Sequence, residues 1–277
     1  MNYLLAVSGG VDSVVLLDLF SKTNNHIVVA HVDHGIRGEE SAADARFVKE
    51  LAKKYKTPYV SIELNLSPNA SEELARTKRY KFLLKEAERF NALLVTAHHE
   101  DDAVETIALN IQRGTGWRGL MALNRLGIMR PLLGMTKQQI YDYAVAHRLE
   151  WVEDATNHEL VYARNRMRHT IGKSNLNSKQ IMELRARQLQ LGHDIDIDAA
   201  RLVARHKGDR HFLNMTPESV AIELLGAEIA GVASRPTRPR LKRALIAIKT
   251  SAPGSVHQLG DGISLEFTAR NYTIRVV

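Results

Sequence analysis

The chain has 277 residues, a formal net charge of +7 and no cysteine. Its 44% hydrophobic and 25% charged residues allow a sizeable core, and the length suits two modest domains. The lack of cysteine excludes disulfides, thiolate metal sites, iron–sulfur clusters bound by this chain and thiol nucleophiles. No apolar run approaches the roughly 20 residues that span a bilayer, and no secretory signal is recognisable, so we expect a cytoplasmic protein without membrane contact.

The first half of the chain alternates strand-like and helix-like segments. Short apolar runs predict strands at 3–7, 26–33, 58–64 and 92–98. Apolar residues at helical spacing predict helices at 13–23, 41–55, 69–90 and 100–113. Strands separated by helices of this length predict right-handed crossovers and an α/β fold with a doubly wound parallel sheet. In such folds ligands bind where strands end and helices begin.

The second half of the chain changes in character. Thr136 and Gln139 have the spacing of a capping box, which predicts a helix start there. Further helical patterns occupy 178–192, 217–231 and 241–250, and alternation over 254–277 predicts a terminal β-meander. We therefore expect a first domain of residues 1–175 and a smaller, mixed α+β region of residues 176–277.

Positive charge is concentrated in that second half. Between Ile229 and Gly260 there are six Lys or Arg residues and no Asp or Glu. Such an excess can serve solubility alone, but clustered cations are also typical of proteins that bind a polyanion such as RNA. We favour the polyanion.

The stretch "SGGVDS" lies between the first predicted strand and the first predicted helix. Consecutive glycine N–H groups beside a helix N-terminus form a donor surface for phosphate. A plain connecting turn explains one glycine but not the combination of small and polar residues found here. Asp12 would repel a phosphate unless a divalent cation lay between them, which favours a nucleotide together with Mg²⁺.

The stretch "HHEDDAVET" follows the last predicted strand of the first half. Asp101, Asp102 and Glu105 are spaced to share one face of a helix. Acids in a first helical turn are favoured by the helix dipole, which accounts for one or two of them. Three beside two histidines instead indicate a cluster that holds Mg²⁺ and orients an amine. Asp12 and Asp101 are the candidate Mg²⁺ ligands.

These motifs together resemble a known family. "SGGVDS" resembles the signature of the PP-loop ATP pyrophosphatases, which cleave ATP between the α and β phosphates and adenylate a substrate oxygen. "HVDHGIRGEES", "AHHEDDAVET" and "EDATNHELVYARNRMRHTI" resemble segments of the tRNA(Ile)-lysidine synthetases within that superfamily. The resemblance is dense from Leu4 to about Ile171 and loose afterwards.

The resemblance assigns roles to individual residues. Four carboxylates are expected to be catalytic: Asp12, Asp101, Asp102 and Glu105. The residues expected to bind ATP are Ser8, Gly9, Gly10, Asp12, Ser13, His31, Arg113 and Gly114. The residues expected to bind the tRNA or another substrate are Asp33, Arg37, Arg79, Asp154, Asn157, Arg164, Asn165 and Arg168.

The resemblance also implies a reaction and its partners. ATP would adenylate the C2 oxygen of the wobble cytidine in a tRNA(Ile) with a CAU anticodon, and L-lysine would displace AMP to form lysidine. ATP and Mg²⁺ are the expected co-substrate and cofactor. The basic region 176–277 is expected to bind the tRNA. The sequence leaves the oligomeric state open, with a homodimer as one option.

Two alternatives remain at this stage. The chain could be another tRNA-modifying PP-loop ligase, although the thiolating members generally need the cysteines that it lacks. It could also be a non-catalytic nucleotide- or tRNA-binding protein that retains the turn. The intact carboxylates Asp12, Asp101, Asp102 and Glu105 argue against the second alternative, because drift need not spare charged residues without a function.

Overall fold

The computed structural model describes residues 1–33, 35, 39–64, 66, 70–153 and 177–276. The chain divides into two compact units, Met1–Arg185 and Ala186–Val277, and each is described here by itself. Several residues with predicted roles lie outside the described part: Arg37, Asp154, Asn157, Arg164, Asn165 and Arg168.

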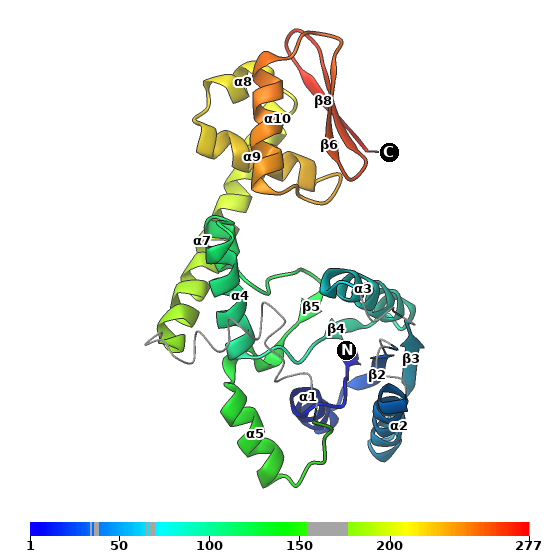
Figure 1. Cartoon of the computed structure of the whole chain (residues 1–277). Helices are drawn as coiled ribbons and strands as arrows, with labels where there is room; N and C mark the ends of the chain where they lie inside the picture. Colours follow the sequence, from blue (N-terminus) through cyan, green and yellow to red (C-terminus); the bar gives the residue numbers. More distant parts are fainter. Residues whose placement is uncertain (34, 36–38, 65, 67–69, 154–176, 277) are drawn as a thin grey trace. The chain divides into compact units, whose positions relative to one another are not determined.

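The first unit is built on a five-stranded sheet in the order β3-β2-β1-β4-β5, in which every neighbouring pair is parallel (Figure 1). The strands are β1 (Asn2–Ala6), β2 (His26–Asp33), β3 (Tyr59–Glu63), β4 (Leu93–Val95) and β5 (Ile128–Met129). The chain order reverses direction across the sheet between β1 and β4, which is where doubly wound folds bind their ligands. The predicted parallel α/β sheet is confirmed.

Helices cover both faces of this sheet. The helices of the first unit are α1 (Val11–Ser21), α2 (Glu39–Lys54), α3 (Glu72–Arg89), α4 (Glu100–Gln112) and α5 (Lys137–Ala146), with short 3₁₀ turns η1 (Trp117–Leu120) and η2 (Pro131–Gly134). One core joins the sheet to α1, α2 and α5, and a second core joins it to α3 on the opposite face (Figure 1). Strands that are buried on both faces need continuous apolar runs, and Leu4 and Leu5 in β1 are both fully buried.

A buried carboxylate ties α5 to α1. Asp18 accepts hydrogen bonds from the hydroxyls of Tyr55 at 2.9 Å and Tyr143 at 2.8 Å, and its other contact is Lys22 at 2.8 Å. Burial alone would raise the pKa of Asp18, but the hydrogen bonds from Lys22, Tyr143 and Tyr55 hold it below its ordinary value. Burial, followed by the Asp18 contact, raises the pKa of Tyr55 to about 12. The network fixes the position of α5, whose first residue enters the candidate site.

The second unit combines helices with a small antiparallel sheet. Its elements are the C-terminal part of α7 (Ser178–His206), α8 (Arg210–Met215), α9 (Glu218–Ala230), α10 (Arg238–Thr250), β6 (Val256–Gly260), β7 (Ile263–Phe267) and β8 (Tyr272–Val276). The sheet order β6-β7-β8 with antiparallel pairs confirms the predicted meander. None of the helices in the described part of the chain combines the length and apolar character that crossing a membrane requires.

Two charged side chains are buried in the described part of the second unit. Arg210 donates to the carbonyls of Ile248, Ser251 and Thr268 at 2.6 to 2.8 Å, which satisfies the C-terminal end of α10. Glu228 accepts from the backbone N–H of Gly208 at 3.1 Å and from the hydroxyl of Tyr272. Burial raises the pKa of Glu228, and the two hydrogen bonds oppose that shift.

The helix α7 is longer than predicted. The apolar spacing predicted an end at Gly192, but the helix continues for another fourteen residues to His206. A glycine inside a helix costs only about 1 kcal/mol, and Gly192 is buried, so packing outweighs its poor helix propensity. The prediction of the end at Gly192 was wrong for that reason.

Candidate active site

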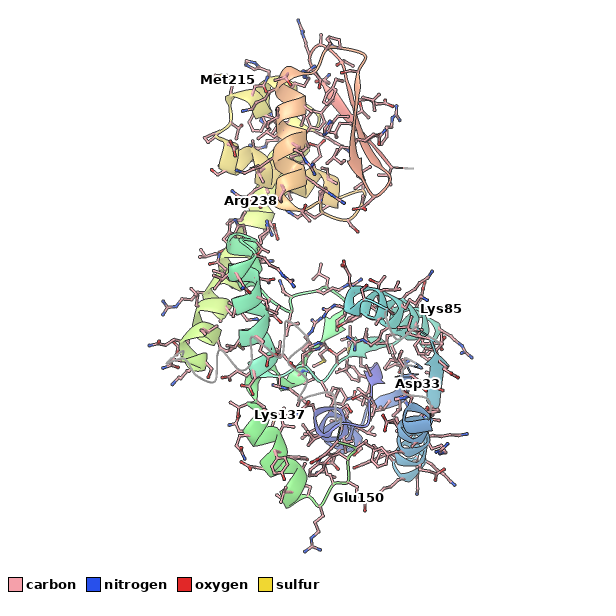
Figure 2. The ribbon with its side chains drawn as sticks, in the orientation of Figure 1. Asp33, Lys85, Lys137, Glu150, Met215 and Arg238 are labelled. Carbon is pink, nitrogen blue, oxygen red and sulfur yellow. The ribbon has the colours of Figure 1, made fainter. Side chains whose placement is uncertain are left out.

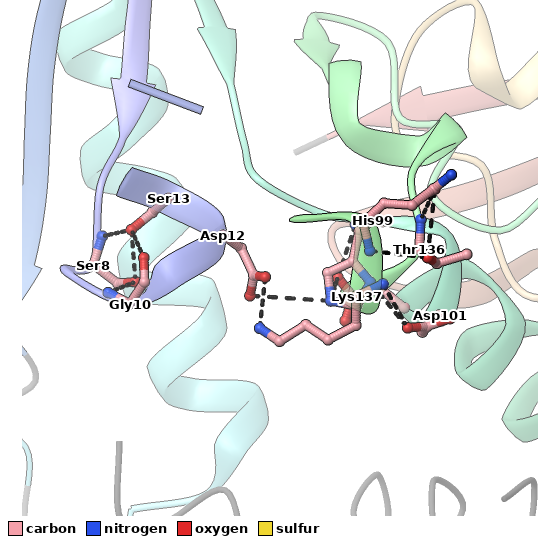
Figure 3. A network of polar contacts seen from close by, with 10 residues as sticks. Ser8, Gly10, Asp12, Ser13, His99, Asp101, Thr136 and Lys137 are labelled. Carbon is pink, nitrogen blue, oxygen red and sulfur yellow. Dashed lines mark hydrogen bonds and ion pairs between the residues drawn. The ribbon is translucent and has the colours of Figure 1, made fainter. Parts of the chain in front are cut away.

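The opening turn between β1 and α1 is held by the hydroxyl of Ser13. This oxygen accepts the backbone N–H groups of Ser8 and Gly9, both at 3.2 Å, and donates to the carbonyl of Gly10 at 2.8 Å (Figure 3). In the described part of the chain, the N–H groups of Val11 and Asp12 have no protein acceptor. The two free donors at the positive end of α1 form a site suited to a phosphate.

Glycine is required at the centre of this turn. Gly9 has a φ of +98°, a conformation that other residues rarely adopt. A Cβ there would also meet Phe47 and Val48 at 3.4 Å. The predicted ATP-binding residue His31 lies at the end of β2 with its ring buried, and its Nδ1 is 2.8 Å from the Val7 carbonyl. His31 therefore supports the strand end that leads into the turn.

A second part of the site is the start of α4, which follows the end of β4. His99 is the N-cap residue, and its backbone N–H donates to Oδ2 of Asp102 at 3.0 Å. Asp102 is therefore committed in part to capping its own helix. The Asp101 carboxylate accepts the backbone N–H of Lys137 at 3.0 Å.

Lys137 brings a third segment into the site. It is the first residue of α5 (Figure 2), and its Nζ lies 2.6 Å from Oδ1 of Asp12 (Figure 3). Its backbone thus contacts Asp101 while its side chain contacts Asp12, so one residue connects the starts of α1 and α4. The sequence analysis did not assign Lys137 a role. The signal was present in the capping box of Thr136 and Gln139, which is confirmed and places Lys137 at a helix start.

His99 lies among three carboxylates. Its Nε2 is 4.0 Å from Asp12 and 3.6 Å from Asp102, and its Nδ1 is 3.8 Å from Asp101. The ring is buried, and its Nδ1 has no hydrogen-bond partner within the described residues. His99 is thus a second residue at the centre of the site that the sequence analysis noted only as a neighbour of the acids.

The remaining predicted residues lie at different distances from this centre. Glu105 is buried in α4, with only 2% of its surface exposed. Arg113 and Gly114 follow the C-terminal end of α4, about 18 Å along the helix axis from Asp101. Asp33, at the end of β2, accepts the backbone N–H of Gly35 at 2.7 Å. Contacts of these residues with a nucleotide or tRNA remain predictions.

The oxygen atoms of the site fit a hard cation. Asp12 and Asp101 are partly exposed, with 30% and 41% of their side chains accessible, so both carboxylates face solvent. No group of three or more His, Asp or Glu side chains able to hold a metal ion occurs among the described residues. Mg²⁺ is usually held by one or two carboxylates together with substrate phosphates, so this donor set suits it.

The parallel sheet, the glycine turn and the acidic helix start at its carboxyl edge define an α/β protein with a nucleotide-phosphate site. Residues 1–175 match the family described as the PP-loop domain. The chain belongs to this family, and that membership supports the use of ATP.

Curated relatives narrow the comparison further. The chain is 39% identical over 178 residues to the tRNA(Ile)-lysidine synthase of Haemophilus ducreyi, covering 61% of this chain and 41% of the relative. It is 34% identical over 273 residues to the protein of that name in Wolbachia pipientis wMel, covering 88% and 62%. A match at 32% identity to the Clostridium tetani protein of the same name covers 79% and 50%. The chain thus spans between 41% and 62% of the length of these relatives.

A solved structure has the same fold. The U34-tRNA thiolase NcsA from Methanococcus maripaludis superposes with a TM-score of 0.57 and 16% identity, covering 69% of this chain and 72% of that one. At this identity the likeness concerns the fold alone.

Proposed function

We propose that this chain is an AMP-forming ligase that joins L-lysine to the wobble cytidine of tRNA(Ile) with a CAU anticodon. ATP adenylates the C2 oxygen of the base and releases pyrophosphate, and the ε-amine of lysine then attacks C2 and expels AMP. The observation that carries this proposal is the convergence of Asp12, Asp101 and Lys137 from three helix starts at the sheet edge where the free N–H groups of α1 also lie. The curated relatives supply the substrate class.

The start of α1 is suited to hold the phosphates of ATP. The N–H groups of Val11 and Asp12 point out of the helix N-terminus, where anions are stabilised by the helix dipole. Lys137 is within reach of the same place, because its Nζ already lies against Asp12. It can exchange this carboxylate for a phosphate oxygen and neutralise charge that builds up as pyrophosphate leaves.

Asp12 and Asp101 are the residues that would hold Mg²⁺. The bound ion would offset the charge of the nucleotide phosphates, which otherwise repel both carboxylates. The Asp101 carboxylate is held in place by the Lys137 backbone, independently of any side-chain movement.

The lysine amine must lose a proton before it attacks, because its ordinary pKa is near 10.4. Asp101 and Asp102 lie at the start of α4, and their side chains are within 3.8 Å and 3.6 Å of His99. A carboxylate here can bind the incoming ammonium group and accept its proton. Glu105 is buried, so we assign it to the support of this face of α4.

Residues 1–175 would act as the catalytic domain and residues 176–277 as a tRNA-binding region. The excess of Lys and Arg over Asp and Glu in the second half supports this division, since clustered cations release counterions from a phosphate backbone. The helix α10 carries five of these cations, and together with the meander it supplies a folded platform for them.

The decisive experiment supplies the chain with ATP, Mg²⁺, labelled lysine and transcripts of the CAU isoleucine and methionine tRNAs. We expect label only in the isoleucine transcript, with one AMP released for each lysine incorporated. AMP release that does not depend on any tRNA, or equal labelling of both transcripts, would contradict the proposal.

A further inference from the structure

A second group of charged residues lies outside the site described above. The guanidinium groups of Arg76 and Arg125 lie 5.3 and 5.5 Å from the ring centre of Tyr80, and Arg79 approaches the same ring at 5.6 Å. Arg130 interacts electrostatically with Tyr80, Arg76 and Arg125, and Arg185 interacts with Arg130. We call Arg76, Arg125, Arg130 and Arg185 the arginine cluster.

No carboxylate of the described residues forms an ion pair with the arginine cluster. Neutral backbone carbonyls position its two half-buried members instead. Arg130 Nη1 donates to the carbonyls of Leu123 at 2.8 Å and Ile128 at 3.3 Å, and Arg185 Nε donates to the carbonyl of Ala122 at 2.9 Å. These bonds fix the guanidinium groups without neutralising their charge.

Two buried polar atoms at the arginine cluster, the hydroxyl oxygen of Tyr80 and Nε of Arg130, make no hydrogen bond of good geometry within the described residues. The polar interaction that these two side chains share is with each other. Tyr80 is 95% buried, since only 5% of its surface is exposed. Buried polar groups in folded proteins are nearly always satisfied, so such atoms commonly mark the place of a ligand or water.

The charge environment of the arginine cluster favours the binding of an anion. Burial lowers the pKa of Arg130, the interaction with Tyr80 opposes that shift, and the nearby charges of Arg76 and Arg125 lower the pKa further. Burial also lowers the pKa of Arg185, with a further contribution from Arg130. The guanidinium groups of the cluster repel one another, and backbone carbonyls hold them in place. An anion bound between them would therefore stabilise the cluster.

The cluster lies at the same edge of the sheet as the ATP site. Arg130 directly follows β5, and Arg76 and Tyr80 lie in the first half of α3, which begins after the carboxyl end of β3. In the sheet order, β4 separates β5 from β1, the strand that leads into the opening turn. The end of β5 and the end of β1 are therefore two strand spacings apart, or roughly 10 Å.

We propose that the arginine cluster binds a phosphodiester group of the RNA substrate. This inference rests on the proposed function and adds the position of one phosphate contact within the first unit. A polynucleotide carries a phosphate at every residue, so it can place one at the cluster while its target base enters the site at α1 and α4. Arginine is suited to such a contact because its planar fork binds two phosphate oxygens together.

The test compares the full chain with the variant Arg76→Ala/Arg125→Ala. Both side chains are exposed and make no hydrogen bond in the described structure, so the variant is expected to fold. Arg46→Ala/Arg148→Ala is the matched control, because it removes the same charge from exposed positions on α2 and after α5. The Kd for the isoleucine tRNA transcript is measured at several salt concentrations, and the Kd for a non-hydrolysable ATP analogue is measured in parallel.

We expect the cluster variant to bind tRNA about tenfold more weakly, with the slope of log K against log salt reduced by about 1 to 2. The control and the affinity for the ATP analogue should not change. A cluster variant that matches the control in tRNA affinity and salt slope overturns the inference. An equal loss of affinity for the ATP analogue also overturns it, because the cluster would then serve the nucleotide phosphates.

Failure of the proposed function gives a different result. If the native chain forms no lysidine while the cluster variant still loses tRNA affinity and salt slope, the phosphate site stands and the proposed reaction falls. If the native chain shows no salt-sensitive tRNA binding, both fall.

Discussion

Replacing Lys137 by methionine separates a catalytic role of its ammonium group from a structural one. Methionine keeps a long unbranched side chain and removes the charge. The backbone N–H that holds Asp101 is unaffected, because it belongs to the main chain of residue 137. The substitution therefore changes one contact of the site, the 2.6 Å ion pair with Asp12.

The structure sets the expected magnitudes. Nearly half of the Lys137 side chain (47%) and 30% of the Asp12 side chain are exposed, so solvent screens the ion pair. Exposed pairs contribute about 0.2 to 1 kcal/mol to folding, and the melting temperature should change little. A charge that stabilises a leaving phosphate is instead typically equivalent to about 10²- to 10³-fold in rate, or about 2.7 to 4 kcal/mol. We expect Lys137→Met to lower tRNA-dependent AMP release by that factor.

The assay measures AMP release under saturating ATP and tRNA, together with thermal unfolding. Lys137→Arg keeps the charge and should recover part of the rate, whereas Lys49→Met removes an exposed lysine of α2 and should have the native rate. A Lys137→Met variant within about threefold of the native rate would refute the reasoning. So would a loss of folding stability large enough to explain the lost activity.

Three further predictions concern buried or catalytic carboxylates. Asp12→Asn should abolish AMP release and leave salt-sensitive tRNA binding intact, as filter binding would measure; loss of tRNA binding would show that the opening turn is misassigned. Asp18→Asn should cost about 1 to 3 kcal/mol in chemical denaturation at neutral pH, because it weakens the hydrogen bonds to Tyr55 and Tyr143. Folding lowers the pKa of Asp18, so its contribution to the free energy of unfolding is present at pH values above its ordinary pKa of 3.8 and is lost as the pH falls. The Asp18→Asn variant should therefore lose less stability in acid than the native chain loses. Folding raises the pKa of Glu228, so its contribution to the free energy of unfolding is present below its ordinary pKa of 4.5 and declines as the pH rises. Glu228→Gln should remove that decline. Native and variant chains whose stability depends on pH in the same way would contradict the prediction.

The repeating units of the first half could be predicted because their signals are local. β2 is found at the predicted residues, and the Thr136–Gln139 capping box marks the start of α5 as expected. β5 was missed because a strand of two residues has no measurable period. Its pairing with β4 depends on tertiary contacts that no local pattern contains.

The acidic helix start shows what spacing cannot supply. The spacing predicted that Asp101, Asp102 and Glu105 share one face of α4, but it could not say what that face meets. In the structure Asp102 turns back to the backbone of His99, Asp101 reaches Lys137, and Glu105 is buried. Residues on one helix face can thus have three different partners, because the neighbours come from elements that are distant in the chain.

The charge count of the site explains why Lys137 lies where it does. Asp12, Asp101 and Asp102 each lie within 4.0 Å of the His99 ring, and negative charges gathered around one residue repel one another. Lys137 compensates one of the three negative charges, and ATP would add several more. A site with this balance binds a polyphosphate only if further positive charge arrives with it, which supports Mg²⁺ as the companion of ATP. Mg²⁺ held by Asp12 would supply that charge, and the ammonium group of Lys137, now paired with Asp12 at 2.6 Å, would then be free to bind a phosphate oxygen.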